Sequence, residues 1–248
     1  MSTIVMDTTE KKKVVGIYVA HEDDAILALA GMILHYIAMG YEVYIVVVTD
    51  CRNSHKIVLN IETNPTVWQV RDTRAAEMIK AMAVLGVHSG NIHFLNWEDG
   101  QGNVWGKDKL ALKQLLQITR ARKPDIVFFH HVDAHIDHRA VNKLVMKMLG
   151  KLRKQPEAHE FFIWTEELAQ ASHNHSLKDI PKVPDDAIKI FLTAEEIDLK
   201  RRSLFEMASQ VRRVQPYPGW QIQKHPILEQ SFIKHFLRGE ETFVKCKP

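Results

Sequence analysis

Residues 14–20 read VVGIYVA and lead directly into residues 21–24, His-Glu-Asp-Asp. The first run is rich in β-branched residues and shows no polar alternation, which is typical of a strand buried on both faces of a parallel sheet. Residues 24–39 are apolar almost all round and predict a buried helix immediately afterwards. The stretch therefore predicts a strand, a turn with four ionisable side chains, and a helix.

The alternation of strand and helix continues along the chain. Further strands are expected at 43–48, 91–95 and 126–130, and helices at 66–85, 108–121 and 138–150. Strands that alternate with helices of this length predict right-handed βαβ units around a parallel sheet. We therefore expect an α/β fold with a Rossmann-like parallel sheet and helices on both of its faces.

The last third of the chain is less regular. Its expected elements are strands at 161–164 and 187–192, a long loop at 165–186, a helix opened by a capping box at 193–196, and a last helix at 226–238. We interpret residues 1–248 as a single domain with a core at about 13–210 and an irregular C-terminal extension at 211–248.

The composition excludes several classes of protein. The chain has 248 residues, of which 46% are hydrophobic and 25% charged, as in a soluble globular domain. A net charge of +3 is too small to indicate nucleic-acid binding. Neither a secretory signal nor an apolar stretch of about 18 residues, the length a membrane span needs, is present. The two cysteines, Cys51 and Cys246, indicate a reducing, cytoplasmic compartment, and a homo-oligomer remains open.

Histidine and acidic side chains gather at two of the expected strand ends. One group lies at 21–24, and the other lies at 130–138, which read HHVDAHIDH. If the strand order turns between the first and fourth strands, both loops flank one crevice at the carboxyl ends of the strands, where such folds bind ligands. Catalytic zinc takes three ligands from His, Asp, Glu or Cys and leaves a position for water. The clusters therefore predict a zinc hydrolase site.

Each cluster alone has a plainer interpretation. Asp24 by itself would make an ordinary helix N-cap, and the motif at 135–138 would by itself be an ordinary surface segment. Two such clusters at equivalent strand ends favour a shared metal site over both interpretations.

The two motifs resemble those of the LmbE-like deacetylases, also called the PIG-L family. Residues 20–25, AHEDDA, resemble the family's AHPDDE, and residues 135–138, HIDH, resemble its HPDH. Weaker agreement at 74–87, 97–100, 123–127 and 200–210 extends the resemblance over about 13–210.

The resemblance implies a zinc-dependent enzyme that removes an N-acetyl group from an N-acetylglucosamine-type conjugate. It implies that one Zn²⁺ per chain is held by His21, Asp24 and His138. It also implies that Asp23 is the general base and that His135 stabilises the oxyanion or acts as the acid.

Three further residues receive roles from the same resemblance. Asp137 would tune His135, and Arg74 and Asp99 stand where the family contacts its sugar. A surface ion pair on a helix is the plainer interpretation of Arg74, and a loop turn is that of Asp99.

The chain departs from the family motif at two positions. Glu22 replaces proline and Ala25 replaces glutamate, but neither is an implied ligand or the implied base. Two other functions remain open: a sugar- or nucleotide-binding domain with an inactive relic of the metal site, and a metal phosphoesterase, although the latter usually holds two metals.

Overall fold

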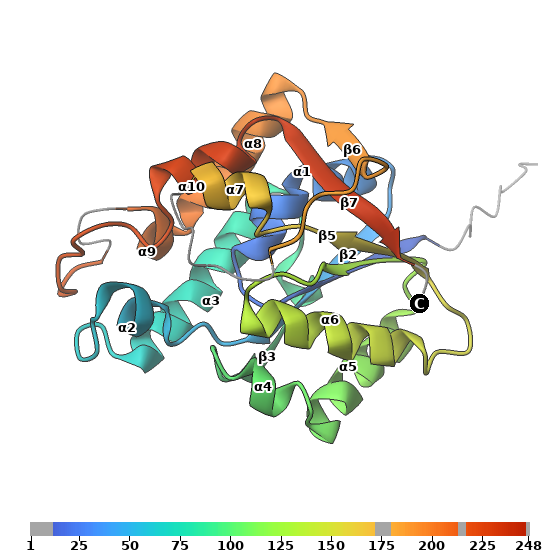
Figure 1. Cartoon of the computed structure of the whole chain (residues 1–248), viewed down its shortest axis with the longest axis horizontal. Coiled ribbons are helices and arrows are strands. Elements are labelled where there is room, and N and C mark those ends of the chain that lie inside the picture. Colours follow the sequence, from blue (N-terminus) through green and yellow to red (C-terminus); the bar gives the residue numbers. More distant parts are fainter. Residues whose placement is uncertain (1–11, 172–179, 213–216, 247–248) are drawn as a thin grey trace, which may run out of the picture.

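The computed structural model describes residues 12–171, 180–212 and 217–246 of the chain. One seven-stranded sheet lies at its centre, with the strand order β3-β2-β1-β4-β5-β7-β6 (Figure 1). The strands are β1 (Val14–Val19), β2 (Glu42–Thr49), β3 (Ile92–Trp97), β4 (Ile126–His130), β5 (Glu157–Phe161), β6 (Ile188–Phe191) and β7 (Glu240–Cys246).

Strand β1 pairs in parallel with β2 on one side and with β4 on the other. The strand order therefore turns between β1 and β4, which meets the condition on which the shared crevice depended, and the crevice of this α/β sheet lies at their carboxyl ends. Strand β7 runs antiparallel to both β5 and β6, so the sheet is mixed rather than wholly parallel.

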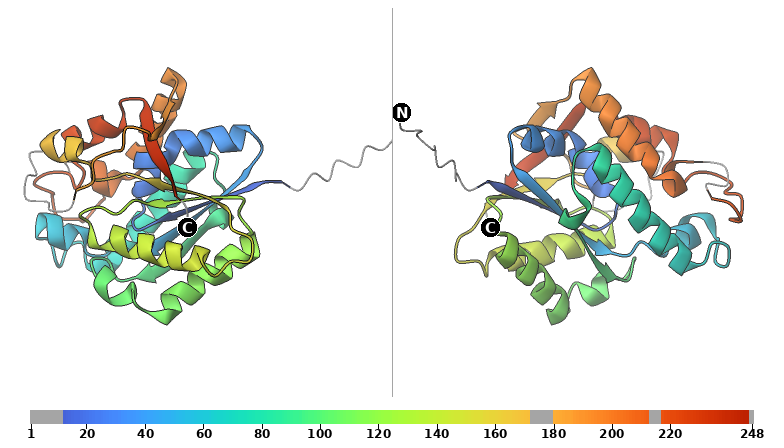
Figure 2. Two further views of the ribbon diagram at one scale, coloured as in Figure 1. Left: turned by 45° about the vertical axis from the view of Figure 1, so that its right-hand side comes forward. Right: turned by 180° about the vertical axis from the view of Figure 1, so that it is seen from behind.

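Helices cover both faces of the sheet. They are α1 (Asp24–Ala38), α2 (Ser54–Leu59), α3 (Val67–Val84), α4 (Gly102–Trp105), α5 (Lys109–Arg122), α6 (Ile136–Leu149), α7 (Glu166–Ala171), α8 (Ala194–Glu206), α9 (Ala208–Val211) and α10 (Gln230–Phe236). Helices α1, α3 and α8 lie together on one face, while α5 and α6 lie on the other (Figure 2). The predicted α/β fold with helices on both faces is confirmed.

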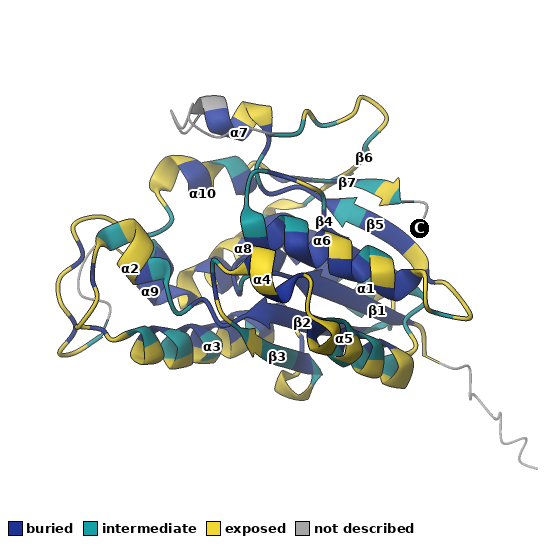
Figure 3. Cartoon of the chain, turned by 60° about the horizontal axis from the view of Figure 1, so that its bottom comes forward, coloured by how far each residue is buried: buried dark blue, intermediate teal, exposed yellow. Residues whose placement is uncertain are grey.

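The two faces of β1 explain its run of apolar residues. Val15, Ile17 and Val19 belong to the core beneath α1 and α3, whereas Val14 and Tyr18 belong to the core beneath α5 and α6. All residues of the strand are buried, and exposed residues gather on the outer faces of the helices (Figure 3). A strand without polar alternation is therefore the expected result of burial on both sides.

The C-terminal part is more regular than the sequence indicated. Strand β5 begins before the expected strand at 161–164, and α7 occupies the start of the expected loop at 165–186, of which 172–179 lie outside the described residues. Among the residues that the structure describes, no helix is both long and apolar enough to cross a membrane.

A buried ion pair ties β7 to the helices. The Glu241 carboxylate accepts the backbone N–H groups of Gly31 and Met32 in α1 at 2.8 and 3.0 Å. It also accepts a hydrogen bond at 2.8 Å from Lys200 of α8, and both side chains are almost fully buried. The C-terminal strand is thus part of the sheet and of the packing around α1.

Candidate metal site and active centre

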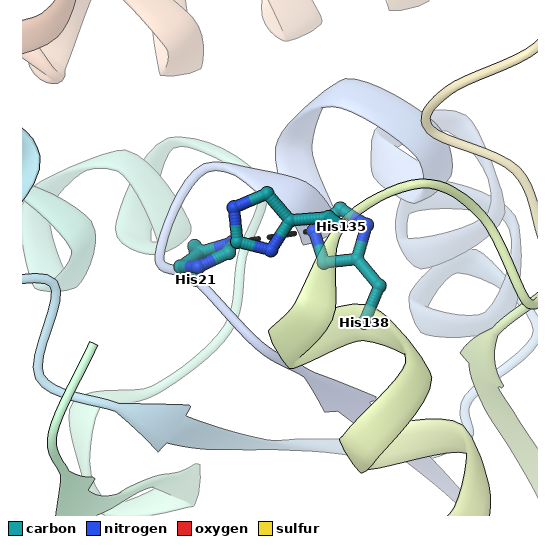
Figure 4. A group of neighbouring side chains, drawn as sticks. All are labelled: His21, His135 and His138. Carbon is teal, nitrogen blue, oxygen red and sulfur yellow. Dashed lines mark hydrogen bonds between the residues drawn. The ribbon is translucent and has the colours of Figure 1, made fainter. Parts of the chain in front are cut away.

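Three side chains that the sequence assigned to a metal converge at the carboxyl ends of β1 and β4. His21 lies in the turn after β1, and Asp24 is the first residue of α1. His138 lies in the first turn of α6, from which its ring points toward His21 (Figure 4). The parallel pairing of β1 with β4 brings the two turns together.

The donor groups of these three residues form a triangle in which each histidine faces a different oxygen of Asp24. His21 Nδ1 lies 3.4 Å from Asp24 Oδ2, His138 Nε2 lies 3.6 Å from Asp24 Oδ1, and the two histidine nitrogens lie 3.3 Å apart. Ligand atoms bound about 2.0–2.1 Å from a tetrahedral zinc ion lie about 3.3–3.4 Å from one another. Two imidazoles and a carboxylate at this spacing therefore fit the ion.

Asp133 orients the second imidazole of the triangle. Its Oδ2 lies 2.8 Å from His138 Nδ1, and its Oδ1 accepts the backbone N–H of His135 at 2.8 Å. Histidines that bind metals through one nitrogen usually donate the other N–H to a carboxylate. Asp133 was not among the predicted site residues, although an acidic residue five positions before His138 was an available signal.

His130 packs against His138 on the buried side of the site. It is fully buried, its ring stacks on that of His138 with centroids 4.0 Å apart, and its Nε2 accepts the Ala20 N–H at 3.0 Å. Burial, together with the charge of His138, lowers the pKa of His130 to about 4. A neutral imidazole therefore packs against the triangle and fixes the end of β1.

His135 faces the same pocket from the N-terminus of α6. Its Nδ1 accepts the Asp137 N–H at 3.3 Å, so in the neutral ring the proton is on Nε2. Burial, followed by the charges of His138 and His21, lowers the pKa of His135 to about 2. The side chain is thus suited to donate a hydrogen bond as a neutral imidazole.

Asp137 and Asp99 both approach the other nitrogen of His21. Asp137 Oδ2 lies 3.4 Å from His21 Nε2, and Asp99 Oδ1 lies 3.5 Å from it. The Asp137 carboxylate also accepts the N–H groups of Gly100 and Gly102 at 2.8 Å each. It therefore fixes the loop after β3 and the His21 ring, while only its backbone contacts His135.

Asp99 has a strongly perturbed acidity. Burial raises its pKa, but the hydrogen bond to His21 and the charges of His21, Arg74 and His135 outweigh burial and lower the pKa to about 2. Its Oδ2 also accepts the Asn53 N–H at 3.3 Å. The carboxylate thus stays ionised beside the donor triangle.

Arg74 is a buried residue of α3 rather than part of a surface ion pair. Its Nε donates to Glu22 Oε2 at 2.9 Å, its Nη1 donates to Gln210 Oε1 at 2.8 Å, and its Nη2 lies 3.4 Å from Asp23 Oδ1. Only 3% of Arg74 and 1% of Glu22 are exposed. Glu22, which departs from the family motif, is therefore the partner that fixes this guanidinium group.

These residues line one open pocket of about 170 Å³. Its polar lining consists of Asp23, Arg74 and Asp99 around the donor triangle, together with His135 and Ser54. Asp23 is nine-tenths buried, and its carboxylate lies between Arg74 and the donor atoms of His21 and Asp24. All eight residues that the sequence singled out thus lie in or directly behind this pocket.

Comparisons with known proteins agree with this arrangement. A family model described as PIG-L, GlcNAc-PI de-N-acetylase, matches residues 17–149. A search of curated proteins finds no match to the sequence.

Three solved structures show the same fold. The hydratase GalB of Pseudomonas putida KT2440, which acts on 4-carboxy-2-hydroxymuconate, is 17% identical with a TM-score of 0.68, over 95% of this chain and 97% of its own. The diacetylchitobiose deacetylase of Pyrococcus horikoshii is 20% identical with a TM-score of 0.61, over 95% and 84%. The zinc-inhibited form of the teicoplanin deacetylase Orf2 is 12% identical with a TM-score of 0.65, over 95% and 99%.

Proposed function

The chain belongs to the PIG-L family of deacetylases, and from this premise we propose that it is a zinc-dependent hydrolase that removes an N-acetyl or other N-acyl group from an N-acetylglucosamine-type conjugate. The observation that carries the proposal is the triangle of donor atoms from His21, Asp24 and His138, with Asp23 beside it. A free carboxylate next to a three-ligand set is what metal-assisted amide hydrolysis requires.

Each of these pocket residues has a separate role in the proposed reaction. Bound by the triangle, zinc supplies Lewis-acid chemistry at the amide carbonyl. Asp23 takes the proton of the attacking water, and Arg74, 3.4 Å away, holds the Asp23 carboxylate in place. His135 donates its Nε2–H to the oxygen on which negative charge develops.

Two residues are proposed to bind the sugar. Asp99 and Arg74 border the pocket beside the reacting centre, and both present charged hydrogen-bonding groups that suit sugar hydroxyls. Asp137 acts behind them, because its carboxylate fixes the loop that carries Asp99.

The fold alone does not choose between reactions. One of the similar structures is a hydratase and two are deacetylases, so the same scaffold serves different chemistry. A binding domain with a relic of the site remains the alternative from another class. The approach of His21, Asp24 and His138 to one another, with Asp23 beside His21 and Asp24, speaks against it.

The cysteines support a reducing, cytoplasmic compartment as part of the proposal. Cys51 is buried and free, and Cys246 is half-buried and free. Nucleic acid plays no part in the proposal, and the oligomeric state is left open.

Release of free amine from a panel of N-acetylglucosamine conjugates tests the proposal. We expect the purified protein to release amine, a chelator to stop the release, and zinc added to one equivalent per chain to restore it. A sugar that binds without any release of amine, with or without zinc, would support the relic-site alternative. Hydration of an unsaturated acid without amine release would instead assign the site to the other chemistry of the fold.

A further inference from the structure

Helix α2 lies at the mouth of the active-site pocket and exposes aliphatic side chains that a surface helix normally buries. Of its six residues only His55 is buried, whereas Ile57 is 68% and Val58 44% exposed (Figure 3). A short surface helix normally buries its aliphatic side chains and exposes its polar ones. The exposed pair therefore calls for an explanation.

The orientation of α2 is fixed by contacts on its buried side. His55 Nε2 lies 2.8 Å from Gln223 Nε2, and the His55 ring meets the edge of Trp220 at a centroid distance of 5.4 Å. Asn64, which follows α2, donates to Gly219 O at 2.9 Å. The helix cannot roll to bury Ile57 without breaking these contacts.

Ile57 and Val58 form one apolar wall of the pocket that holds the donor triangle. A second apolar wall of the same pocket consists of Trp164, Leu228 and Phe232, and the ring centroids of Trp164 and Phe232 lie 5.1 Å apart. Leu228 is held in place because its N–H donates to Gln210 O at 2.9 Å. Two apolar walls thus line the pocket together with its polar residues.

The apolar wall formed by Ile57 and Val58 adjoins the loop beside the reacting centre. Ile57 Cδ1 lies 3.8 Å from the point where a Cβ on Gly100 would stand, so α2 covers the loop whose Asp99 reaches His21. A group held at the walls would therefore belong to the same molecule whose amide lies on the floor.

We propose that the substrate of the deacetylation carries an apolar alkyl or aryl group that lies between the walls formed by α2 and by Trp164, Leu228 and Phe232. This inference rests on the proposed function. Among the wall side chains that line the pocket, Ser54 and the Trp164 indole carry hydrogen-bonding groups, too few to pair a phosphate or the hydroxyls of a second sugar, and burying unpaired polar groups there would weaken binding. The apolar group belongs either to the acyl chain or to the aglycone.

Two substrate series distinguish these sources. One series lengthens the N-acyl chain of glucosamine from acetyl to octanoyl, and the other lengthens the alkyl aglycone of an N-acetylglucosaminide from methyl to octyl. We expect kcat/KM to rise at least about tenfold along one series, mainly through a lower KM, because each buried methylene adds to binding. The series that responds identifies the source.

A matched pair of variants tests the wall itself. Ile57→Ser should lower kcat/KM of the long-chain members at least about fivefold more than it lowers that of the methyl or acetyl member. Ile222→Ser is the control, since Ile222 is 66% exposed but does not line the pocket. Turnover that is equal along both series, or equal effects of the two variants, would overturn the inference.

Calorimetry separates this inference from the proposed function. If no member of either series releases amine, but octyl N-acetylglucosaminide binds more tightly than the methyl compound and Ile57→Ser removes the difference, the inference stands and the deacetylase proposal fails. If amine is released without dependence on chain length, the proposed function stands and the inference fails.

Discussion

At the scale of single residues, the structure gives a partner to Glu22, which departs from the family motif. The sequence offered no role for this glutamate, because its partner Arg74 lies 52 positions away on α3. In the structure the two form a buried pair, and Arg74 in turn faces the proposed base Asp23. The glutamate that replaces proline is therefore linked to the carboxylate of the proposed base through the guanidinium group.

Removal of the Glu22 charge should destabilise the fold. We expect Glu22→Gln to lower the free energy of unfolding by about 3 kcal/mol, because the buried guanidinium group loses its hydrogen-bonded carboxylate and keeps Asp23, 3.4 Å away, as its remaining ion-pair partner. Urea unfolding measures this. Glu62→Gln is the control: its pair with Lys56 is more than half exposed on the glutamate, so a loss of about 0–1 kcal/mol is expected. Equal losses in both variants would contradict the buried pair.

Asp133 should determine metal affinity without touching the metal. Asp133→Asn weakens the acceptor for His138 Nδ1, and we expect zinc affinity to fall about 10–100-fold in a chelator competition. Asp108→Asn alters a carboxylate that likewise accepts a backbone N–H two residues on, but it caps α5 and does not line the pocket, so the affinity should stay unchanged. An unchanged affinity in Asp133→Asn would remove its orienting role.

At the scale of elements, the short helices that the sequence did not predict border the site. Helix α4 has four residues and packs closely on α6, because a Cβ on Gly102 would stand 2.7 Å from Ile136 O and 2.8 Å from Asp137 Oδ1. That contact lets the Asp137 carboxylate reach the Gly102 N–H at 2.8 Å. Elements of this length have too little periodicity to be recognised from sequence.

The close approach of α4 and α6 predicts a sensitive glycine. Gly102→Ala should push α4 away and displace Asp137, and we expect a loss of about 1–3 kcal/mol in stability together with reduced amine release. Gly150→Ala, at the end of α6, meets only ordinary contacts at 3.7 Å or more and should be neutral or slightly stabilising. Unfolding curves and rates of both variants check this, and a neutral Gly102→Ala would refute the packing argument.

The anchoring of α2 through His55 should depend on pH. Burial, followed by the charge of Arg74, lowers the pKa of His55 to about 4, whereas an unfolded histidine titrates near about 6.5. The unfolded chain therefore takes up the proton first, so the contribution of His55 is complete above about pH 6.5 and is lost as the pH falls toward 4.

Unfolding of zinc-free protein between pH 7.5 and 4.5 measures this effect. The stability advantage of the parent chain over His55→Gln should shrink as the pH falls, while that over His88→Gln, an exposed N-cap, should not change in the same way. An advantage that is constant across the range would contradict the buried, neutral His55.

At the scale of the whole molecule, local patterns predicted the strands and the longer helices from 14 to 149, because buried strands and amphipathic helices have recognisable patterns of apolar residues. They could not predict β7. Its run at 240–246 becomes a strand only through antiparallel pairing with β5 and β6 and the buried contact of Glu241 with Lys200. These partners lie between about 40 and 90 positions away, beyond the reach of any local pattern.

The candidate site, like the fold, was predicted only in part from the sequence. Residues that carry the two motifs, such as His21, Asp24 and His138, were predicted and converge in the structure. Asp133, which orients His138, and Glu22, which fixes Arg74, were not predicted. The role of Glu22 depends on a contact with α3, 52 positions away, that only the folded chain provides.

The central claim is that a metal held by the donor triangle and the carboxylate of Asp23 together hydrolyse an amide. The most direct test is the rate of amine release by Asp23→Asn after loading with one equivalent of zinc. The account predicts full zinc binding and a rate that is lower by about 10²–10⁴-fold, because the base is lost while the ligands remain. A zinc-loaded variant that releases amine within a few-fold of the parent rate would contradict it.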